Sequence, residues 1–160
     1  MNDALDEIAR RFEFDATLLQ VETAGFSPAD WSTRPGDRGG NSAHWILGHV
    51  TQSRRALLRA LGADLGTAPW EAPVGRGGNG DTSSLPAPSA LSAEFEQLGR
   101  DLASRLRALT PAQASAPFGF PLPDGRSSTL AGASFLQFHE VYHLGQIGLI
   151  RRLRGHAGFA

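Results

Sequence analysis

The sequence HEVYHLGQ, residues 139–146, carries two histidines four positions apart, His139 and His143. On an α-helix, residues i and i+4 lie one above the other on the same face. Two imidazoles spaced in this way can share one metal ion, because the helix already fixes their separation. The pair therefore predicts a helix with a metal site on one face.

The residues around the pair indicate which face of this helix carries the histidines. At about 100° per residue, one mainly apolar stripe contains both of them. Its other members are Gly132, Phe135, Leu136, Gln146, Ile147, Ile150 and Leu153. Such a stripe faces the interior of a helical bundle, so we expect both imidazoles to point inward. The alternative is a pair of core histidines that bond to neighbouring polar groups.

Four amphipathic segments predict four long helices in a single domain that covers residues 1–160. The predicted helices are residues 3–24, 41–62, 89–109 and 128–155. Each repeats apolar residues at helical spacing, and capping residues such as Ser42 precede them. Short helical turns are expected near 28–31 and 110–111. With no convincing strand, this pattern predicts an all-α fold, a four-helix bundle.

Two long loops separate the predicted helices. Residues 63–88 are rich in Gly, Pro and Ser, and residues 116–127 contain three prolines. The first loop could be a crossover, because its ~26 residues readily span the ~30 Å length of a bundle. It could also be a mobile lid or a disordered excursion. In the second loop, Phe118 and Phe120 could cover one end of the bundle.

One upstream histidine is positioned to meet the helical pair. His49 lies on the border of the apolar face of the second helix, about 60° from Ile46, whereas His44 projects at about 160°. We therefore expect His44 to face solvent or a loop. His49, His139 and His143 would leave coordination positions open for water or substrate, and the bound water or thiol would have a lowered pKa.

Composition limits the classes of function. The formal net charge is −1, which argues against a nucleic-acid partner held by bulk phosphate attraction. The chain has no cysteine, which excludes disulfides, thiolate ligands and a cysteine nucleophile. No apolar run approaches the roughly 18 residues of a membrane span, and the acidic start does not resemble a signal peptide. A cytoplasmic protein is expected, and a homodimer is an open option, because such bundles often pair.

The pattern His139-Glu140-x-x-His143 is also the HExxH motif of zinc peptidases, in which the Glu is the general base. That class commonly takes a third ligand downstream, yet no Asp or Glu follows His143. An edge strand for a peptide substrate is not predicted either. Glu140 lies about 100° from the histidine stripe, so it is expected at the surface or supporting a ligand from behind.

Two motifs together carry a family resemblance. NSAHWILGHV, residues 41–50, and HxxxHxGQI, residues 139–147, resemble the DinB/YfiT-like superfamily over nearly the whole chain in element order and spacing. The resemblance implies a four-helix bundle with a crossover. It also implies a divalent metal bound by one histidine of the second helix and two of the fourth. These match His49, His139 and His143.

The resemblance further implies an activity. Some members are transferases or isomerases that use mycothiol or bacillithiol, so Zn or Ni, with Fe or Mn as further options, would activate a low-molecular-weight thiol toward a small-molecule substrate. The absence of cysteine fits a sulfur brought in by a cosubstrate. Gln146 would bond substrate or a ligand histidine, or simply pack. A metal-dependent hydrolase and a non-catalytic, stress-related metal-binding bundle are the alternatives.

Overall fold

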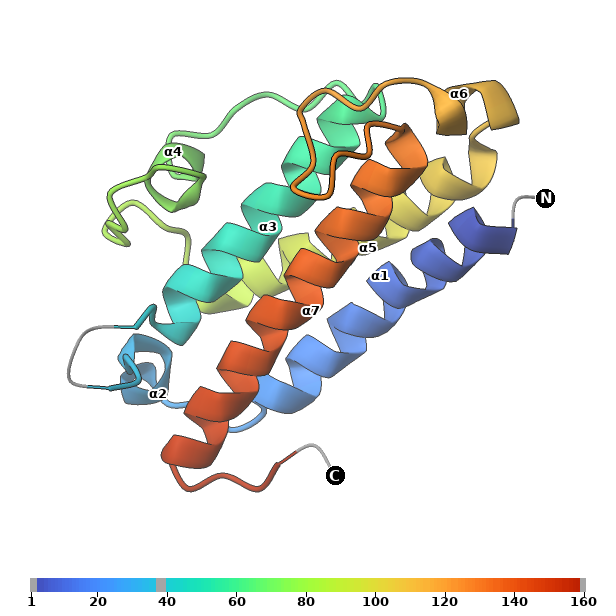
Figure 1. Cartoon of the computed structure of the whole chain (residues 1–160). Coiled ribbons are helices and arrows are strands. Elements are labelled where there is room, and N and C mark those ends of the chain that lie inside the picture. The colour runs from blue at the N-terminus through green and yellow to red at the C-terminus, as the bar shows by residue number, and fades with distance from the viewer. Residues whose placement is uncertain (1–2, 37–39, 159–160) are drawn as a thin grey trace.

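Four long helices form a bundle in the computed structural model, which describes residues 3–36 and 40–158 (Figure 1). The long helices are α1 (Asp3–Thr23), α3 (Ala43–Ala60), α5 (Pro88–Ala108) and α7 (Thr129–Leu153). Three short helices lie between them: α2 (Pro28–Ser32), α4 (Glu71–Val74) and α6 (Pro111–Ser115). Within these residues the only β-type pairing is an isolated bridge between Pro117 and Ser128. The predicted all-α four-helix bundle is confirmed.

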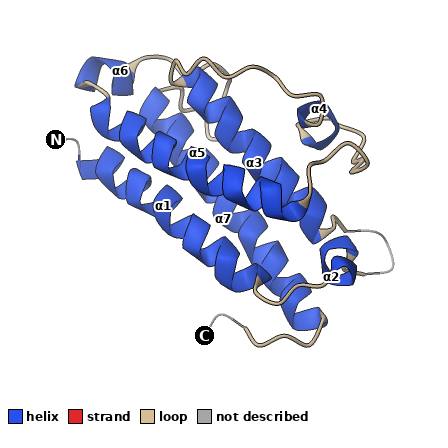
Figure 2. Ribbon diagram, turned by 180° about the vertical axis from the view of Figure 1, so that it is seen from behind, coloured by secondary structure: helices blue, strands red, loops and turns tan. Residues whose placement is uncertain are grey.

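The helices α1 and α3 occupy opposite corners of the bundle, because each packs against both α5 and α7. The colour gradient shows that α3 and α5 run in the same direction (Figure 1), and the view from behind shows the connection between them on the outside of the bundle (Figure 2). The segment between Ala60 and Pro88 therefore returns along the length of the bundle, which confirms the crossover interpretation.

Side-chain caps explain where the helices begin. Ser42 accepts a hydrogen bond from the backbone N–H of Trp45 at the start of α3, and Ser128 accepts one from Ala131 at the start of α7. Ser27 and Thr110 form capping boxes at the two short helices that follow them. Such caps satisfy N–H groups that a helix start leaves unpaired, so the sequence locates these boundaries well.

A buried polar layer divides the apolar core into two clusters. Phe12 of α1 belongs to one cluster and Phe95 of α5 to the other. The guanidinium of Arg54 lies between them, 3.4 Å from the centroid of the Phe95 ring and 5.6 Å from that of Phe12. Arg54 and its ion-pair partner Glu140 are each 1 % exposed. The expectation of a surface position for Glu140 is therefore wrong.

The burial of Glu140 also corrects the predicted orientation of α7. Its fully buried stripe runs through Leu136, Glu140 and Leu144, whereas the two histidines are only partly buried. They lie on the flank of this stripe that faces α3. The physical reason is that Arg54, from another helix, neutralises a carboxylate which a helical wheel of α7 alone would place outside.

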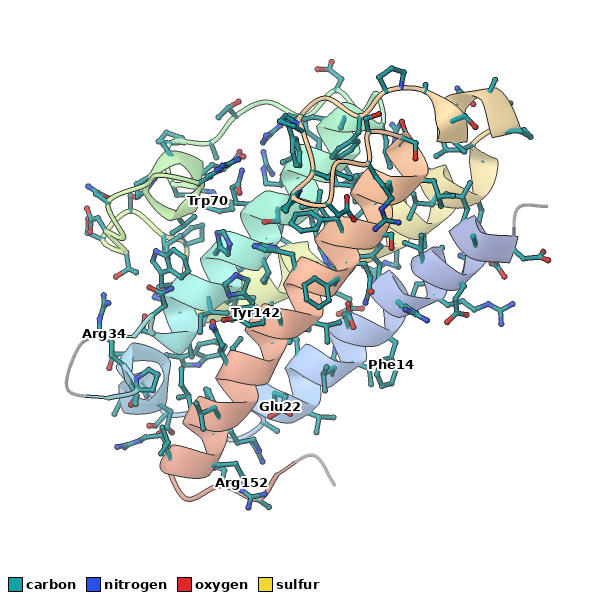
Figure 3. All side chains as sticks on the ribbon, viewed as in Figure 1. Phe14, Glu22, Arg34, Trp70, Tyr142 and Arg152 are labelled. Atoms are coloured by element: carbon teal, nitrogen blue, oxygen red, sulfur yellow. The ribbon has the colours of Figure 1, made fainter. Side chains whose placement is uncertain are left out.

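The crossover segment is packed against α3 rather than disordered. Trp70 and Val74 are buried, and Figure 3 labels Trp70 beside α3. Leu85 covers Gly48 so closely that a Cβ atom at Gly48 would lie 2.7 Å from a Leu85 methyl carbon. Near the end of the segment, the ring of His44 contacts the Pro86 carbonyl oxygen at 2.8 Å. The disordered alternative is wrong, and His44 faces the loop.

The second long loop closes one end of the bundle mainly through Phe118. This side chain is buried and packs on Gly132 of α7, where an added Cβ atom would lie 2.4 Å from the Phe118 ring. Phe120 contacts Phe118 edge to face with 4.7 Å between ring centroids, and it is 38 % exposed. Phe118 therefore contributes more than Phe120 to the packing at this end of the bundle.

None of the helices in the described ranges has the length and apolar character needed to cross a membrane. The cytoplasmic location and the homodimer stay predictions.

Candidate metal centre

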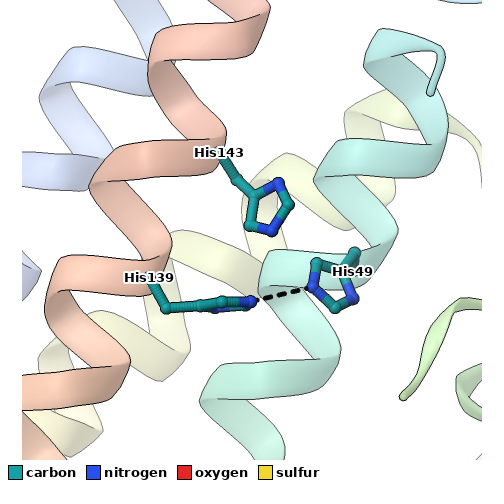
Figure 4. A group of neighbouring side chains, drawn as sticks. All are labelled: His49, His139 and His143. Atoms are coloured by element: carbon teal, nitrogen blue, oxygen red, sulfur yellow. Dashed lines mark hydrogen bonds between the residues drawn. The ribbon is translucent and has the colours of Figure 1, made fainter. Parts of the chain in front are cut away.

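Three imidazoles converge between α3, which carries His49, and α7, which carries His139 and His143 (Figure 4). The ring centroid of His49 lies 4.9 Å from that of His139 and 4.7 Å from that of His143, and the latter two are 4.6 Å apart. One ring nitrogen from each residue lies within 4.8 Å of the other two. The structure therefore brings together the three histidines that the sequence singled out.

Hydrogen bonds assign the protons on two of the three rings. Nδ1 of His49 lies 2.6 Å from the Val74 carbonyl oxygen, and because a carbonyl only accepts, this nitrogen carries the hydrogen. Nδ1 of His143 lies 2.9 Å from Oε1 of Gln146, which also accepts. Both rings consequently present an unprotonated Nε2. Gln146 thus contacts one of the three histidines.

The third ring is held less firmly. Nε2 of His139 lies 3.1 Å from Nε2 of His49, whereas its buried Nδ1 has no hydrogen-bond partner among the described residues. Since His49 Nε2 carries no hydrogen, His139 Nε2 must donate in this contact. A cation at the same place would accept lone pairs from all three Nε2 atoms once His139 is in the tautomer that carries its hydrogen on Nδ1. The donor set therefore fits a divalent metal ion.

Burial keeps the three imidazoles neutral. It lowers the pKa of His49 and of His143, and together with the neighbouring His143 and His49 rings it lowers the pKa of His139 to about 4. Neutral imidazole is the form that binds metals. In the described part of the chain, no carboxylate is among the causes of these shifts. A bound dication would keep its full charge for an anionic ligand.

Aromatic side chains flank the rings. Trp45 stacks on His49 with 4.8 Å between centroids and 15° between planes, and Tyr142 meets His143 edge to face at 5.3 Å. The indole N–H of Trp45 is buried without a hydrogen-bond partner among the described residues. The partly buried indole of Trp45 lowers the local dielectric beside His49, which strengthens electrostatic interactions there.

Glu140 lies next to His139 in sequence but is directed to a different place. Its two carboxylate oxygens accept hydrogen bonds from Nε and Nη2 of Arg54 at 2.7 and 2.6 Å. Arg54 also donates to the carbonyl oxygens of Phe95 and Phe12, at 2.6 and 2.8 Å. Glu140 is therefore engaged in the bundle centre rather than held ready as a general base.

Sequence reasoning missed Arg54 and the Val74 carbonyl. A signal for Arg54 was present, since it follows Val50 by four residues and so continues the apolar stripe of α3. A charged residue on such a stripe requires a buried partner. No residue pattern marks the Val74 carbonyl, because a backbone acceptor is independent of the side chain.

The fold and these residues define a class, an all-α bundle with three histidines placed to bind a metal between two helices. The chain belongs to the DinB superfamily, whose family model matches residues 11–147 and so includes all three histidines. This confirms the family resemblance. No curated protein matches the chain.

Among solved structures, the fold is similar to that of YfiT from Bacillus subtilis. The TM-score is 0.71 at 18 % sequence identity, and the match covers 98 % of this chain and 91 % of the YfiT chain. YfiT is described as a probable metal-dependent hydrolase with an unusual four-helix bundle topology. At this identity the likeness establishes the shared fold.

Proposed function

We propose that His49, His139 and His143 bind one divalent metal ion, Zn or Ni first and Fe or Mn next, and that the protein is a metal-dependent thiol S-transferase acting on small electrophiles. The observation that carries the proposal is the convergence of three neutral imidazoles, two of them with the hydrogen already fixed on Nδ1. When bound, such an ion supplies Lewis acidity and lowers the pKa of a coordinated nucleophile.

The nucleophile in this proposal is a thiol. Glu140, which would be the general base of an HExxH mechanism, is occupied by Arg54. A dication held by the three histidines would lower the pKa of a thiol from its ordinary value of about 8.5, so that ionisation of the thiol would not require a protein base. Because the chain has no cysteine, a low-molecular-weight cosubstrate has to supply the sulfur. A sulfur–carbon bond then forms, the leaving group departs with its electron pair, and the thiol proton passes to solvent.

The chain's own residues orient the reactants. Val74 and Gln146 hold the rings of His49 and His143 through Nδ1, which fixes the direction of each Nε2 lone pair. The Trp45 and Tyr142 side chains border the rings of His49 and His143. The proposed substrate is therefore a small molecule that fits beside aromatic groups.

A metal-dependent hydrolase is the second candidate, and it has equal support from relatives because YfiT is described as a probable metal-dependent hydrolase. The same three histidines would then hold a water-activating ion. Glu140 has no part in this version, in contrast to the HExxH mechanism, because its carboxylate pairs with Arg54.

Turnover assays separate the two candidates. The zinc-loaded and nickel-loaded protein would be incubated with an activated aryl halide, an epoxide, an ester and an amide, with and without mycothiol or bacillithiol. The transferase proposal expects electrophile consumption only with thiol, and a rate at least about 100-fold lower in His143→Ala. Equal rates without thiol would favour the hydrolase. Metal binding with neither activity would contradict both and leave a non-catalytic, stress-related bundle.

A further inference from the structure

We propose that Glu71 is a positioning residue of the histidine site: it clamps the short helix α4 to α3 so that the Val74 carbonyl holds the ring of His49. The inference rests on the proposed metal-binding function of His49. It assigns a role to the crossover segment, which reaches a ligand ring from 25 residues away in sequence.

The crossover segment contacts α3 through the first and the last residue of α4. At the first residue of α4, the Glu71 carboxylate accepts hydrogen bonds from Nε of Arg55 at 2.9 Å and from Nη2 of Arg59. At its last residue, the Val74 carbonyl accepts from His49 at 2.6 Å. Arg55, Arg59 and His49 all belong to α3. The position of α4 therefore determines whether the carbonyl reaches the ring.

Glu71 is built into this contact rather than lying on the surface. Its side chain is almost fully buried, with 3 % of the residue exposed. It also accepts a hydrogen bond from the backbone N–H of Ala68 at 2.8 Å, and the carbonyl oxygen of Glu71 accepts from Gly75 at 2.9 Å. One carboxylate thus connects two arginines of α3 with the backbone that enters α4.

Helix α4 needs such a clamp because it has only four residues. A helix this short is unstable by itself, so tertiary contacts determine its place. Without the clamp, the Val74 carbonyl could leave His49, and the ring would populate the tautomer with hydrogen on Nε2. That hydrogen would occupy the direction in which the lone pair faces His139. A group that fixes a ligand tautomer typically contributes 10–100-fold to metal affinity.

The test compares Glu71→Gln with the matched control Glu94→Gln. Both substitutions remove one carboxylate that pairs with Arg55, but Glu94 belongs to α5 and does not contact α4 through this pair. Zinc affinity would be measured by competition with a chelator. The tautomer of His49 would be read from imidazole ¹⁵N shifts in metal-free protein. We expect Glu71→Gln to weaken zinc binding by about 10–100-fold and to mix the tautomers. Glu94→Gln should change neither.

A wild-type tautomer and wild-type zinc affinity in Glu71→Gln would overturn the inference. A wild-type protein that binds no zinc would instead contradict the proposed function, while the tautomer measurement in metal-free protein would still test the clamp. If Glu71→Gln fails to fold, Arg59→Gln loosens the same clamp from its more exposed partner, with the same two readouts.

Discussion

Two carboxyl groups, those of Asp15 and Glu140, lie near one guanidinium inside the bundle, and Arg54 forms its ion pair with Glu140. Asp15 is 2 % exposed, and Nε2 of Gln137 donates a hydrogen bond to it at 3.3 Å. Burial, followed by the charge of Glu140, raises the pKa of Asp15 to about 8. Asp15 is therefore protonated at neutral pH in the folded protein, whereas in the unfolded chain it ionises near its ordinary value.

The substitution Asp15→Asn should reveal this proton through the pH dependence of stability. Between the ordinary pKa of 3.8 and the folded value of about 8, the folded protein binds one more proton than the unfolded chain. The wild type therefore loses stability as pH rises through this range, and the variant does not. At pH 8, urea unfolding should show the variant more stable by several kcal/mol, at about 1.4 kcal/mol for each pH unit of this range, with the difference vanishing near pH 4. A difference that is constant with pH would contradict the assignment.

At the residue scale, the sequence predicted the position of a side chain where the pattern lay within one helix. His139 and His143 stand at a spacing that places both on one face of α7, and the structure brings them together. The surface position expected for Glu140 was wrong because its burial depends on an ion pair with Arg54. Arg54 comes from α3, and the sequence of α7 alone does not indicate this tertiary contact. The protonation of Asp15 has the same origin in partners from other elements.

At the scale of elements, the Arg54–Glu140 pair joins the two helices that carry the histidines. Arg54 follows His49 on α3, and Glu140 follows His139 on α7. The bonds between them at 2.6 and 2.7 Å fix the offset of one helix relative to the other. A buried ion pair of this kind contributes more to the alignment of α3 with α7 than to the free energy of unfolding.

Breaking the pair from one side should be more harmful than removing both charges. Arg54→Met leaves Glu140 buried beside Asp15 without a cation, and we expect about 3–5 kcal/mol of destabilisation in urea unfolding at pH 7. Adding Glu140→Leu should recover part of this loss. Destabilisations that simply add in the double variant would show that the two side chains are not coupled.

A helix could be predicted from the sequence where capping residues and a periodic apolar pattern mark it. Caps at Ser42 and Ser128 and apolar repeats set the long helices to within a few residues. Helix α4 had no such signal, because Trp70 before it makes no capping hydrogen bond and its contacts with α3 hold it in place.

At the scale of the whole molecule, the crossover and the helix order place the histidines in a partly buried interface. The sequence predicted the four-helix fold, and it left open whether residues 63–88 cross the bundle or form a lid. That choice depends on contacts such as Leu85 on Gly48, which have no periodic pattern.

The burial of the site should shift the pH range of metal binding. The pKa values of the three histidines are lowered from the ordinary 6.5, that of His139 to about 4, so protons compete with the metal only at lower pH. The increase in Tm caused by excess zinc should persist at pH 6 and disappear as pH falls toward 4. A loss centred at pH 6.5 or above, as for exposed histidines, would contradict this account.

The central claim is that three histidines from two helices hold one metal ion. The most direct test is the zinc content of untagged protein after dialysis, compared among wild type, His49→Ala and the matched control His44→Ala on the same helix. We predict about one equivalent in the wild type and in His44→Ala, and less than about a tenth in His49→Ala. Undiminished zinc in His49→Ala, or none in the wild type, would contradict the claim.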